Sequence, residues 1–221
     1  MGSPTPSISS SLSKLKARIG TAKIAPAPEP ERPEMTEDEV ERMLRYFRVP
    51  PRFLKCTFDN FAGGDKIKAI LKEKGAWTDS ILLYGTTGGG KTHLATAMLR
   101  YHLREIAKTT NQVRFTTAPD ILLSIRSCFS RNMDELALVN GFADLGYLII
   151  DDLGADKPTD WAIQTFYLIL DRRSREELPT FVTSNLSIQS IENQYGARIA
   201  SRLADMRTIN LQMPDYRKRR K

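Results

Sequence analysis

Short apolar runs alternate with longer amphipathic stretches over most of the chain, from Arg52 onward. The apolar runs predict strands at 81–84, 113–117, 147–151, 180–185 and 208–212. Between them, apolar residues recur at helical spacing and predict helices at 66–74, 91–107, 118–129, 132–142, 159–174, 187–194 and 197–205. Strands that alternate with helices are typical of parallel sheets with helical crossovers. The pattern therefore predicts an α/β fold, with a parallel sheet between helices.

A different pattern occupies residues 1–34. Apolar residues recur there at helical spacing among serines and basic residues, and the proline-rich run 25–35 follows as an extended tether. The apolar positions are Ile8, Leu12, Leu15 and Ile19. We expect a flexible segment whose short amphipathic helix binds a partner, and which is either disordered when free or held in the partner's groove.

Residues 35–51 predict a linker helix. Thr36 and Glu39 have the spacing of a capping box, and Pro50 with Pro51 stops the helix. One helical face is apolar and consists of Val40, Met43, Leu44 and Phe47. Residues 52–221 then form the main domain.

Composition narrows the class of protein. Hydrophobic residues make up 41% of the 221 residues, and no apolar run approaches the ~20 residues that span a bilayer. The first 20 residues lack the continuous apolar core of a secretory signal. Cys56 and Cys128 are too few for a disulfide framework. We expect a cytoplasmic protein with two reduced thiols.

Positive charge is concentrated at the C-terminus. The 33 Lys and Arg residues exceed the 26 Asp and Glu residues by 7, and the last seven residues, DYRKRRK, carry five positive charges and one negative. This end is either a solvated terminus or a non-specific contact with nucleic-acid phosphates.

The sequence GTTGGGKT, residues 85–92, fits the pattern G-x-x-x-x-G-K-[ST] between a predicted strand and a predicted helix. Glycines there let backbone N–H groups surround phosphates, and the positive end of the following helix adds attraction. We expect Lys91 to reach the β- and γ-phosphates and the Thr92 hydroxyl to bind Mg²⁺. The candidate ATP-binding residues are Gly85, Thr86, Thr87, Gly88, Gly89, Gly90, Lys91 and Thr92.

Polar residues end two further apolar runs. Asp151 and Asp152 follow YLII, where Asp151 is expected to orient Mg²⁺ and Asp152 to polarise the attacking water. Asn185 ends PTFVTSN and can reach the γ-phosphate or that water. A surface turn is the alternative for the two acids, and a turn-forming asparagine for Asn185.

The stretch GARIASRL, residues 196–203, places Arg198 and Arg202 four residues apart on one helix face. An arginine here can reach the ATP site of a neighbouring subunit. The alternative is a pair of ordinary surface arginines.

The order of these motifs resembles that of AAA+ ATPases. The P-loop, LIIDDLG, PTFVTSN and GARIASRL are similar to those of the DnaC/DnaI helicase loaders and the IstB transposition ATPases. The stretch TDWAIQTFYLILDRRSREELPTFVTSN and the late DYR extend the resemblance over residues 54–217. It implies that residues 52–221 form an AAA+ P-loop core with a five-stranded parallel sheet. It also implies ATP hydrolysis between subunits of a ring or spiral.

The resemblance also implies roles for single residues. Asn185 takes the sensor-1 role, and Arg202 the arginine-finger role, with Arg198 close by. Single-stranded DNA is expected along the inner surface of the assembly. The candidate DNA contacts are Lys157, Thr159 and Trp161, although a tryptophan here is equally well explained as a core residue.

Two features depart from the AAA+ pattern. Many AAA+ proteins have glutamate where Asp152 stands, and the shorter side chain predicts slow hydrolysis. The chain ends soon after Arg202, so no C-terminal lid domain is expected.

Four ring-bearing residues near these motifs have simpler interpretations. Phe58 and Phe61 either pack near the adenine or belong to the core. His93 and His102 have no partners at metal-ligand spacing and are interpreted as structural.

The leading hypothesis is an ATP-dependent loader that delivers a replicative hexameric helicase onto single-stranded DNA during replication initiation. The alternative is an IstB-like transposition ATPase that regulates target-DNA capture by a transposase. A small-molecule kinase is a third possibility, but it leaves the sensor and finger motifs unexplained. The N-terminal segment favours the loader, because an amphipathic helix on a tether suits docking into a partner.

Overall fold

The structure is a computed structural model that describes residues 35–110, 112–131, 134–155 and 157–216. The amphipathic stretch and most of the tether predicted within residues 1–34 lie outside the described residues, as does the basic run 217–221. Within the described ranges, every helix is too short or too polar to cross a bilayer.

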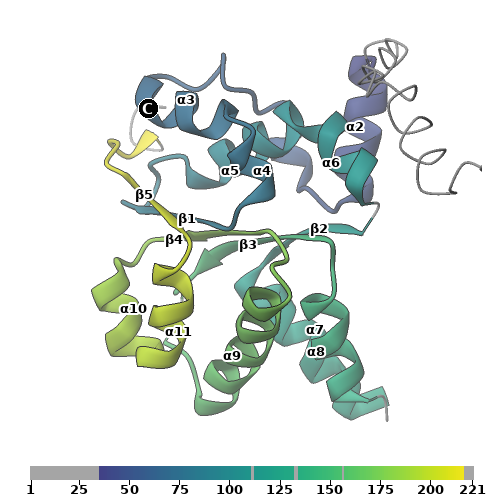
Figure 1. Cartoon of the computed structure of the whole chain (residues 1–221), viewed down its shortest axis with the longest axis vertical. Helices are drawn as coiled ribbons and strands as arrows, with labels where there is room; N and C mark the ends of the chain where they lie inside the picture. The colour runs from purple at the N-terminus through teal and green to yellow at the C-terminus, as the bar shows by residue number, and fades with distance from the viewer. Residues whose placement is uncertain (1–34, 111, 132–133, 156, 217–221) are drawn as a thin grey trace, which may run out of the picture. The chain divides into compact units, whose positions relative to one another are not determined.

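A five-stranded parallel sheet lies at the centre of the described residues, with the strand order β2-β3-β4-β1-β5 (Figure 1). This confirms the predicted α/β fold and the number of strands. The strands are β1 (Ile81–Gly85), β2 (Val113–Thr117), β3 (Tyr147–Leu153), β4 (Thr180–Ser184) and β5 (Arg207–Leu211).

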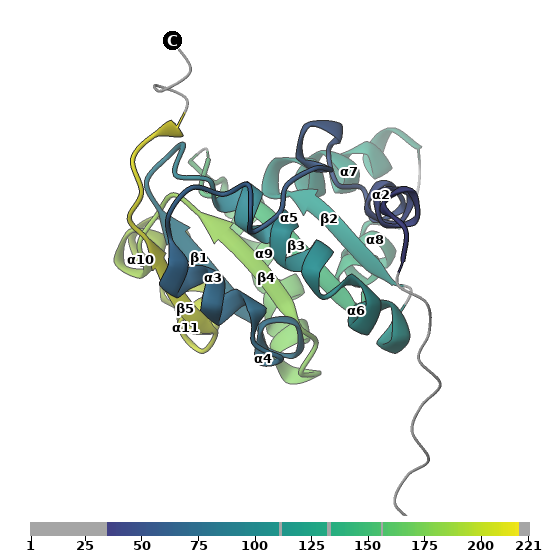
Figure 2. The same cartoon turned by 90° about the horizontal axis from the view of Figure 1, so that it is seen from above.

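Helices cover both faces of the sheet (Figures 1 and 2). One face carries α2 (Glu37–Tyr46), the 3₁₀ turn η1 (Pro51–Phe53), α3 (Asp65–Lys72), α4 (Gly75–Thr78), α5 (Lys91–Tyr101) and α6 (Leu103–Thr109). The other face carries α7 (Ala118–Arg131), α8 (Glu135–Ala143), α9 (Asp160–Arg175), α10 (Ile188–Tyr195) and α11 (Ala197–Ala204).

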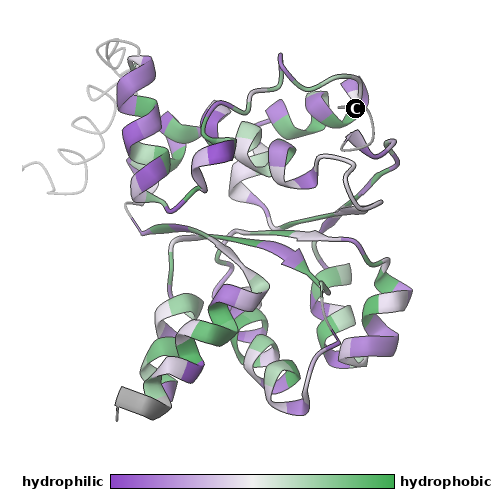
Figure 3. Ribbon diagram, turned by 180° about the vertical axis from the view of Figure 1, so that it is seen from behind, coloured by the Kyte–Doolittle hydropathy of each residue, from purple (hydrophilic) through white to green (hydrophobic). Residues whose placement is uncertain are grey.

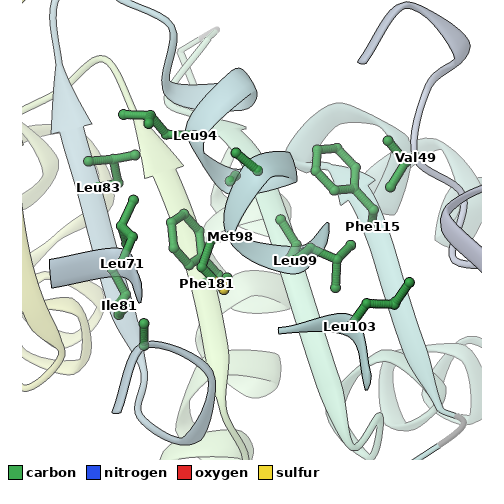
Figure 4. Close-up of a cluster of buried hydrophobic side chains, with 14 of the residues drawn as sticks. Val49, Leu71, Ile81, Leu83, Leu94, Met98, Leu99, Leu103, Phe115 and Phe181 are labelled. Atoms are coloured by element: carbon green, nitrogen blue, oxygen red, sulfur yellow. The ribbon is translucent and has the colours of Figure 1, made fainter. Parts of the chain in front are cut away.

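Each face of the sheet has its own hydrophobic core. Strand residues alternate between the two faces, so Ile81 and Leu83 pack with α5, whereas Leu82 packs with α9 and α11. Figure 4 shows the first core, in which Met98 and Phe181 lie close together. In Figure 3 the helices carry both hydrophobic and hydrophilic residues, as expected for helices with one buried face.

The helix predicted as a linker packs against the first of these cores. The Thr36–Glu39 capping box is present at the start of α2. Leu44 and Phe47 are fully buried, and the Phe47 carbonyl accepts a hydrogen bond of 2.7 Å from Phe115 N–H of edge strand β2. This contact covers part of an edge that would otherwise expose unpaired backbone groups.

The single helix predicted over 91–107 is wrong, because α5 ends at Tyr101 and α6 begins at Leu103. His102 lies between them with φ −95° and ψ 7°, outside the helical conformation. Its ring Nε2 lies 2.9 Å from the Leu71 carbonyl oxygen of α3. A tertiary contact between helices accompanies the break, and apolar spacing alone does not reveal it.

Candidate ATP-binding site

The P-loop, the two acids and Asn185 gather at the C-terminal edge of the sheet, where the parallel strands end. Here β1 leads into residues 85–92, β3 contains Asp151 and Asp152, and β4 ends one residue before Asn185. Neighbouring parallel strands end at the same edge, which explains how three separate motifs reach one place.

Gly88 and Gly90 of the loop have positive φ angles and close neighbours. Gly88 has φ +75°, and a Cβ atom there would meet the Asp215 carboxylate at 1.9 Å. Gly90 has φ +90°, and a Cβ atom there would lie 2.5 Å from the Phe61 ring. Only glycine suits both positions, and the open backbone leaves room for phosphate groups to approach.

The first turn of α5 faces this loop. Gly90 occupies the N-cap position without a side-chain cap, so backbone N–H groups at this positive helix end are suited to an anion. Lys91 is 8% exposed, and its Nζ donates to the carbonyls of Gly85 at 3.1 Å and Thr86 at 3.0 Å. The loop therefore holds the cation beside the place where phosphates are expected.

Thr92 and Asp151 form a group that fits Mg²⁺. Thr92 Oγ1 lies 3.1 and 2.9 Å from the two carboxylate oxygens of Asp151. Magnesium in nucleotide sites takes one or two protein oxygens, completed by phosphates and water. When bound, the ion would neutralise phosphate charge. Among the described residues, no group of three His, Cys, Asp or Glu side chains could hold a metal alone.

Burial gives Asp151 unusual electrostatics. The pKa of the Asp151 carboxyl is raised, and burial is the largest cause. Hydrogen bonds from Thr183 and Thr92 lower this pKa, and the nearby Asp152 charge raises it. The Thr183 hydroxyl donates to Asp151 Oδ1 at 2.6 Å. Sequence reasoning missed Thr183, although it stands in the quoted stretch PTFVTSN.

Asp152 and Asn185 are exposed at the same edge, where a water molecule and a phosphate can reach them. Asp152 has φ +60°, which is uncommon for a residue other than glycine. Ser184 fixes the strand end beside Asn185, because its hydroxyl donates to the Leu153 carbonyl and accepts from Leu186 N–H. The catalytic roles of Asp152 and Asn185 remain predictions.

The segment after β5 also contacts the P-loop, which sequence reasoning did not predict. Thr86 Oγ1 donates to the Met213 carbonyl at 2.7 Å, and Tyr216 N–H donates to the Gly88 carbonyl at 3.1 Å. The Tyr216 ring meets the Phe61 ring edge-on, with centroids 5.7 Å apart. Residues 212–216 therefore form one wall of the site, and the similarity of DYR to the family was the only signal for it.

Arg202 lies at the opposite edge of the sheet. Its guanidinium donates to Asp171 Oδ1 at 3.0 and 2.8 Å. Arg202 also lines a polar pocket with Ser80, which directly precedes β1, and Thr180, which begins β4. The length of β1 separates this edge from the P-loop, and its five residues span about 16 Å at ~3.3 Å per residue. Arg202 is therefore badly placed for its own chain's nucleotide. Arg198 is exposed, and its guanidinium lies 5.8 Å from the centre of the Tyr167 ring.

The three candidate DNA contacts have different surroundings. Lys157 is exposed beside a cleft of about 400 Å³ that also contains Asp152. Thr159 is the N-cap of α9, and its hydroxyl accepts from Ala162 N–H. Trp161 is partly buried against the second core. Its Nε1–H donates to Glu135, and the Arg126 guanidinium lies 4.9 Å from the ring centre. Their role in DNA binding stays a prediction.

The aromatic rings beside the P-loop are largely buried. Phe58 and Phe61 are each 4% exposed, and Phe61 lies between Gly90 and Tyr216. His93 Nε2 lies 2.9 Å from the Thr57 carbonyl oxygen, and burial lowers the pKa of this histidine. The surroundings of His93 fit its predicted structural role.

Comparison with known proteins agrees with this geometry. Residues 71–211, more than half of the chain, match the family of the IstB-like ATP binding protein. The chain belongs to this family. The replicative helicase loader DnaC of Buchnera aphidicola subsp. Baizongia pistaciae is a relative of this IstB-like chain. It is 25% identical over 193 residues, which cover 82% of this chain and 77% of the relative.

Two solved structures share the fold of this IstB-like chain. A DnaC helicase loader matches with a TM-score of 0.60 at 19% identity, over 75% of this chain and all of the other. AMPPCP-bound DnaA from Aquifex aeolicus matches with a TM-score of 0.59 at 21% identity, over 71% of this chain. This chain spans 50% of that DnaA chain. The fold is therefore that of the AAA+ P-loop NTPases.

Proposed function

We propose that this IstB-like protein is an ATPase that loads a replicative hexameric helicase onto single-stranded DNA. One observation is the main support for ATPase activity: Thr92, Asp151 and Lys91 lie together where β1 and β3 end. A relative over most of this chain is named a replicative helicase loader, which supports the choice of partner.

The chain's own residues divide the work of ATP hydrolysis. The P-loop amides and Lys91 bind and orient the phosphates, and Thr92 with Asp151 holds Mg²⁺. Asp152 accepts a proton from the attacking water, and Asn185 orients that water. Arg202 acts on the nucleotide of an adjacent subunit in a ring or spiral, which is consistent with its position at the far edge. The short Asp152 side chain keeps turnover slow, as suits a switch.

Single-stranded DNA binding belongs to the same proposal, with Lys157, Thr159 and Trp161 as candidates. The Arg126 guanidinium lies 4.9 Å from the centre of the Trp161 ring and would have to move before a base could stack on that face. The basic run in DYRKRRK offers further phosphate contacts.

A transposition ATPase is the second candidate, because the matching family is the IstB-like one. The deciding experiment mixes the purified protein with the replicative helicase or with an IS21-type transposase from the same genome. Binding is measured with ATP and with ADP. Helicase activity is then assayed on a single-stranded DNA circle that is coated with a single-stranded-DNA-binding protein. We expect ATP-dependent binding and loading of the helicase. Binding of the transposase alone would contradict the loader and favour the second candidate.

A version lacking residues 1–34 tests where the partner docks. We expect it to keep ATP binding and to lose the helicase, as should a Leu12→Asp, Leu15→Asp double variant. A Ser10→Asp, Ser13→Asp variant is the matched control, since it adds the same charge on the side of the predicted helix opposite the apolar stripe. Full helicase affinity in the truncated protein would instead locate docking on residues 35–221.

A further inference from the structure

The β3–β4 ladder is interrupted at the two acids of the site. Ile150 pairs with Val182 and Leu153 pairs with Ser184, so Asp151 and Asp152 together face the single residue Thr183. Two residues opposite one is the pattern of a β-bulge, which commonly redirects side chains near functional sites. The positive φ of Asp152 belongs to this bulge.

The Thr183 hydroxyl contacts both acids. It accepts a hydrogen bond of 2.9 Å from Asp152 N–H and donates one of 2.6 Å to Asp151 Oδ1. Thr183 is 1% exposed, so these bonds are shielded from water. One hydroxyl thus replaces the backbone partner that the bulge removes from Asp152, and it also fixes the carboxylate of Asp151.

The bulge separates two neighbouring acids by environment. Asp151 is 6% exposed and faces Thr92, whereas Asp152 is exposed to the cleft. A non-glycine residue with positive φ costs roughly 1–2 kcal/mol, so the surrounding structure must hold it in place. The Asp152 N–H bond to Thr183 supplies a specific contact for that purpose.

We propose that Thr183 is a positioning residue that aligns Asp151 toward Thr92 and aims Asp152 at the attacking water. This inference rests on the proposed ATPase activity. Thr183 is 1% exposed, so direct contact with a nucleotide is not part of the proposed role. It acts through the two acids, and its hydroxyl rather than its methyl group carries the effect.

Two pairs of proteins isolate the hydroxyl. Thr183→Val removes it from the parent while keeping a β-branched side chain. Thr183→Ala differs from Thr183→Ser by the hydroxyl alone, and both lack the methyl group. Thr165→Val is the matched control, since Thr165 is a buried threonine of α9 whose hydroxyl donates to the Trp161 carbonyl in the same helix. All are assayed well below the lowest melting temperature.

We expect kcat to fall about 10- to 100-fold in the valine and alanine variants, as for other residues that orient metal ligands. The KM for ATP should change much less. The Mg²⁺ concentration that half-saturates binding of a fluorescent ATP analogue should rise by a similar factor. The parent, Thr183→Ser and Thr165→Val should have closely similar values. If the valine variant does not fold, the serine–alanine pair decides.

Three outcomes separate the possibilities. If kcat and the Mg²⁺ requirement follow melting temperature instead of the hydroxyl, Thr183 is only a packing residue and the inference is overturned. If the hydroxyl-free variants match the parent, it is likewise overturned. A parent that binds ATP without hydrolysing it contradicts the proposed activity alone, and the Mg²⁺ titration then decides the case of Thr183.

Discussion

The sheet has one edge where its parallel strands end and an opposite edge where they begin, and these two edges use charged residues in opposite ways. At the C-terminal edge, α5 begins without a side-chain cap and Asp152 is exposed, so this edge retains groups for a ligand. At the other edge, Arg173 is 1% exposed and its guanidinium is enclosed by the protein. It donates to the Thr180 hydroxyl and to four carbonyls, those of Phe142, Ala143, Leu145 and Pro179.

This difference shows how to separate binding residues from structural ones. Burial lowers the pKa of Arg173 to about 10, so the side chain is still charged at neutral pH. The hydrogen bonds of Arg173 join the end of α8 to the start of β4. The partners of this guanidinium therefore come from the chain itself. Changes at the first edge should therefore alter function without unfolding the protein, and a change at Arg173 should do the reverse.

The largest expected effect is that of Asp152→Asn. We expect turnover to fall by about 10²–10⁴-fold, because the amide cannot accept the proton of the attacking water. ATP affinity and melting temperature should stay close to the parent's, since asparagine tolerates a positive φ. Phosphate release measures the effect, and Asp38→Asn on exposed α2 is the control. Normal turnover would mean that another group activates the water.

Lys91→Ala should act on binding. Removing one partner of a buried, hydrogen-bonded charge pair costs about 2–5 kcal/mol. At ~1.4 kcal/mol per tenfold, ATP affinity should fall by about 30-fold to several thousand-fold. Equilibrium titration checks this, with exposed Lys66→Ala as the control. Parent-like affinity would contradict the assignment of Lys91 to the phosphates.

Arg173→Met should lower the free energy of unfolding by at least ~3 kcal/mol, because several buried acceptors lose their donor at ~1–3 kcal/mol each. Urea denaturation measures the loss, and ATP turnover per folded molecule should not change. Arg172→Met is the matched control. Arg172 bonds to Asn140 and Asp144 with its side chain 39% exposed, so its loss should cost at most ~1 kcal/mol. Equal losses in the two variants would remove the contrast between them.

Arg202→Ala is an expected exception to this contrast between the two edges. Arg202 lies at the same edge as Arg173 but is proposed to act on the ATP of a neighbouring subunit. We expect unchanged ATP binding and a turnover loss smaller than ~10³-fold. Asp171→Ala removes the same intrachain pair and keeps the arginine, so it should retain turnover. Mixing Arg202→Ala with Lys91→Ala should partly restore activity. An absence of rescue at every ratio would count against action between subunits.

Much of this site could be predicted because its motifs are local. The spacing in GTTGGGKT identifies the loop, and the apolar runs before Asp151 and Asn185 identify two strand ends. Parallel strands bring such ends to one edge, so the meeting of these motifs follows from the fold class. The break at His102 was not predictable in the same way, since its partner Leu71 lies 31 residues earlier in the chain.

The sequence by itself determined the types of the elements, the phosphate loop and the acids that accompany it. The tertiary structure alone decided which edge Arg202 occupies, how residues 212–216 line the P-loop, and that Thr183 holds both acids across a bulge. The reason is physical. Periodicity and turn residues act over a few positions, whereas these contacts join residues far apart in the chain and depend on strand register and packing.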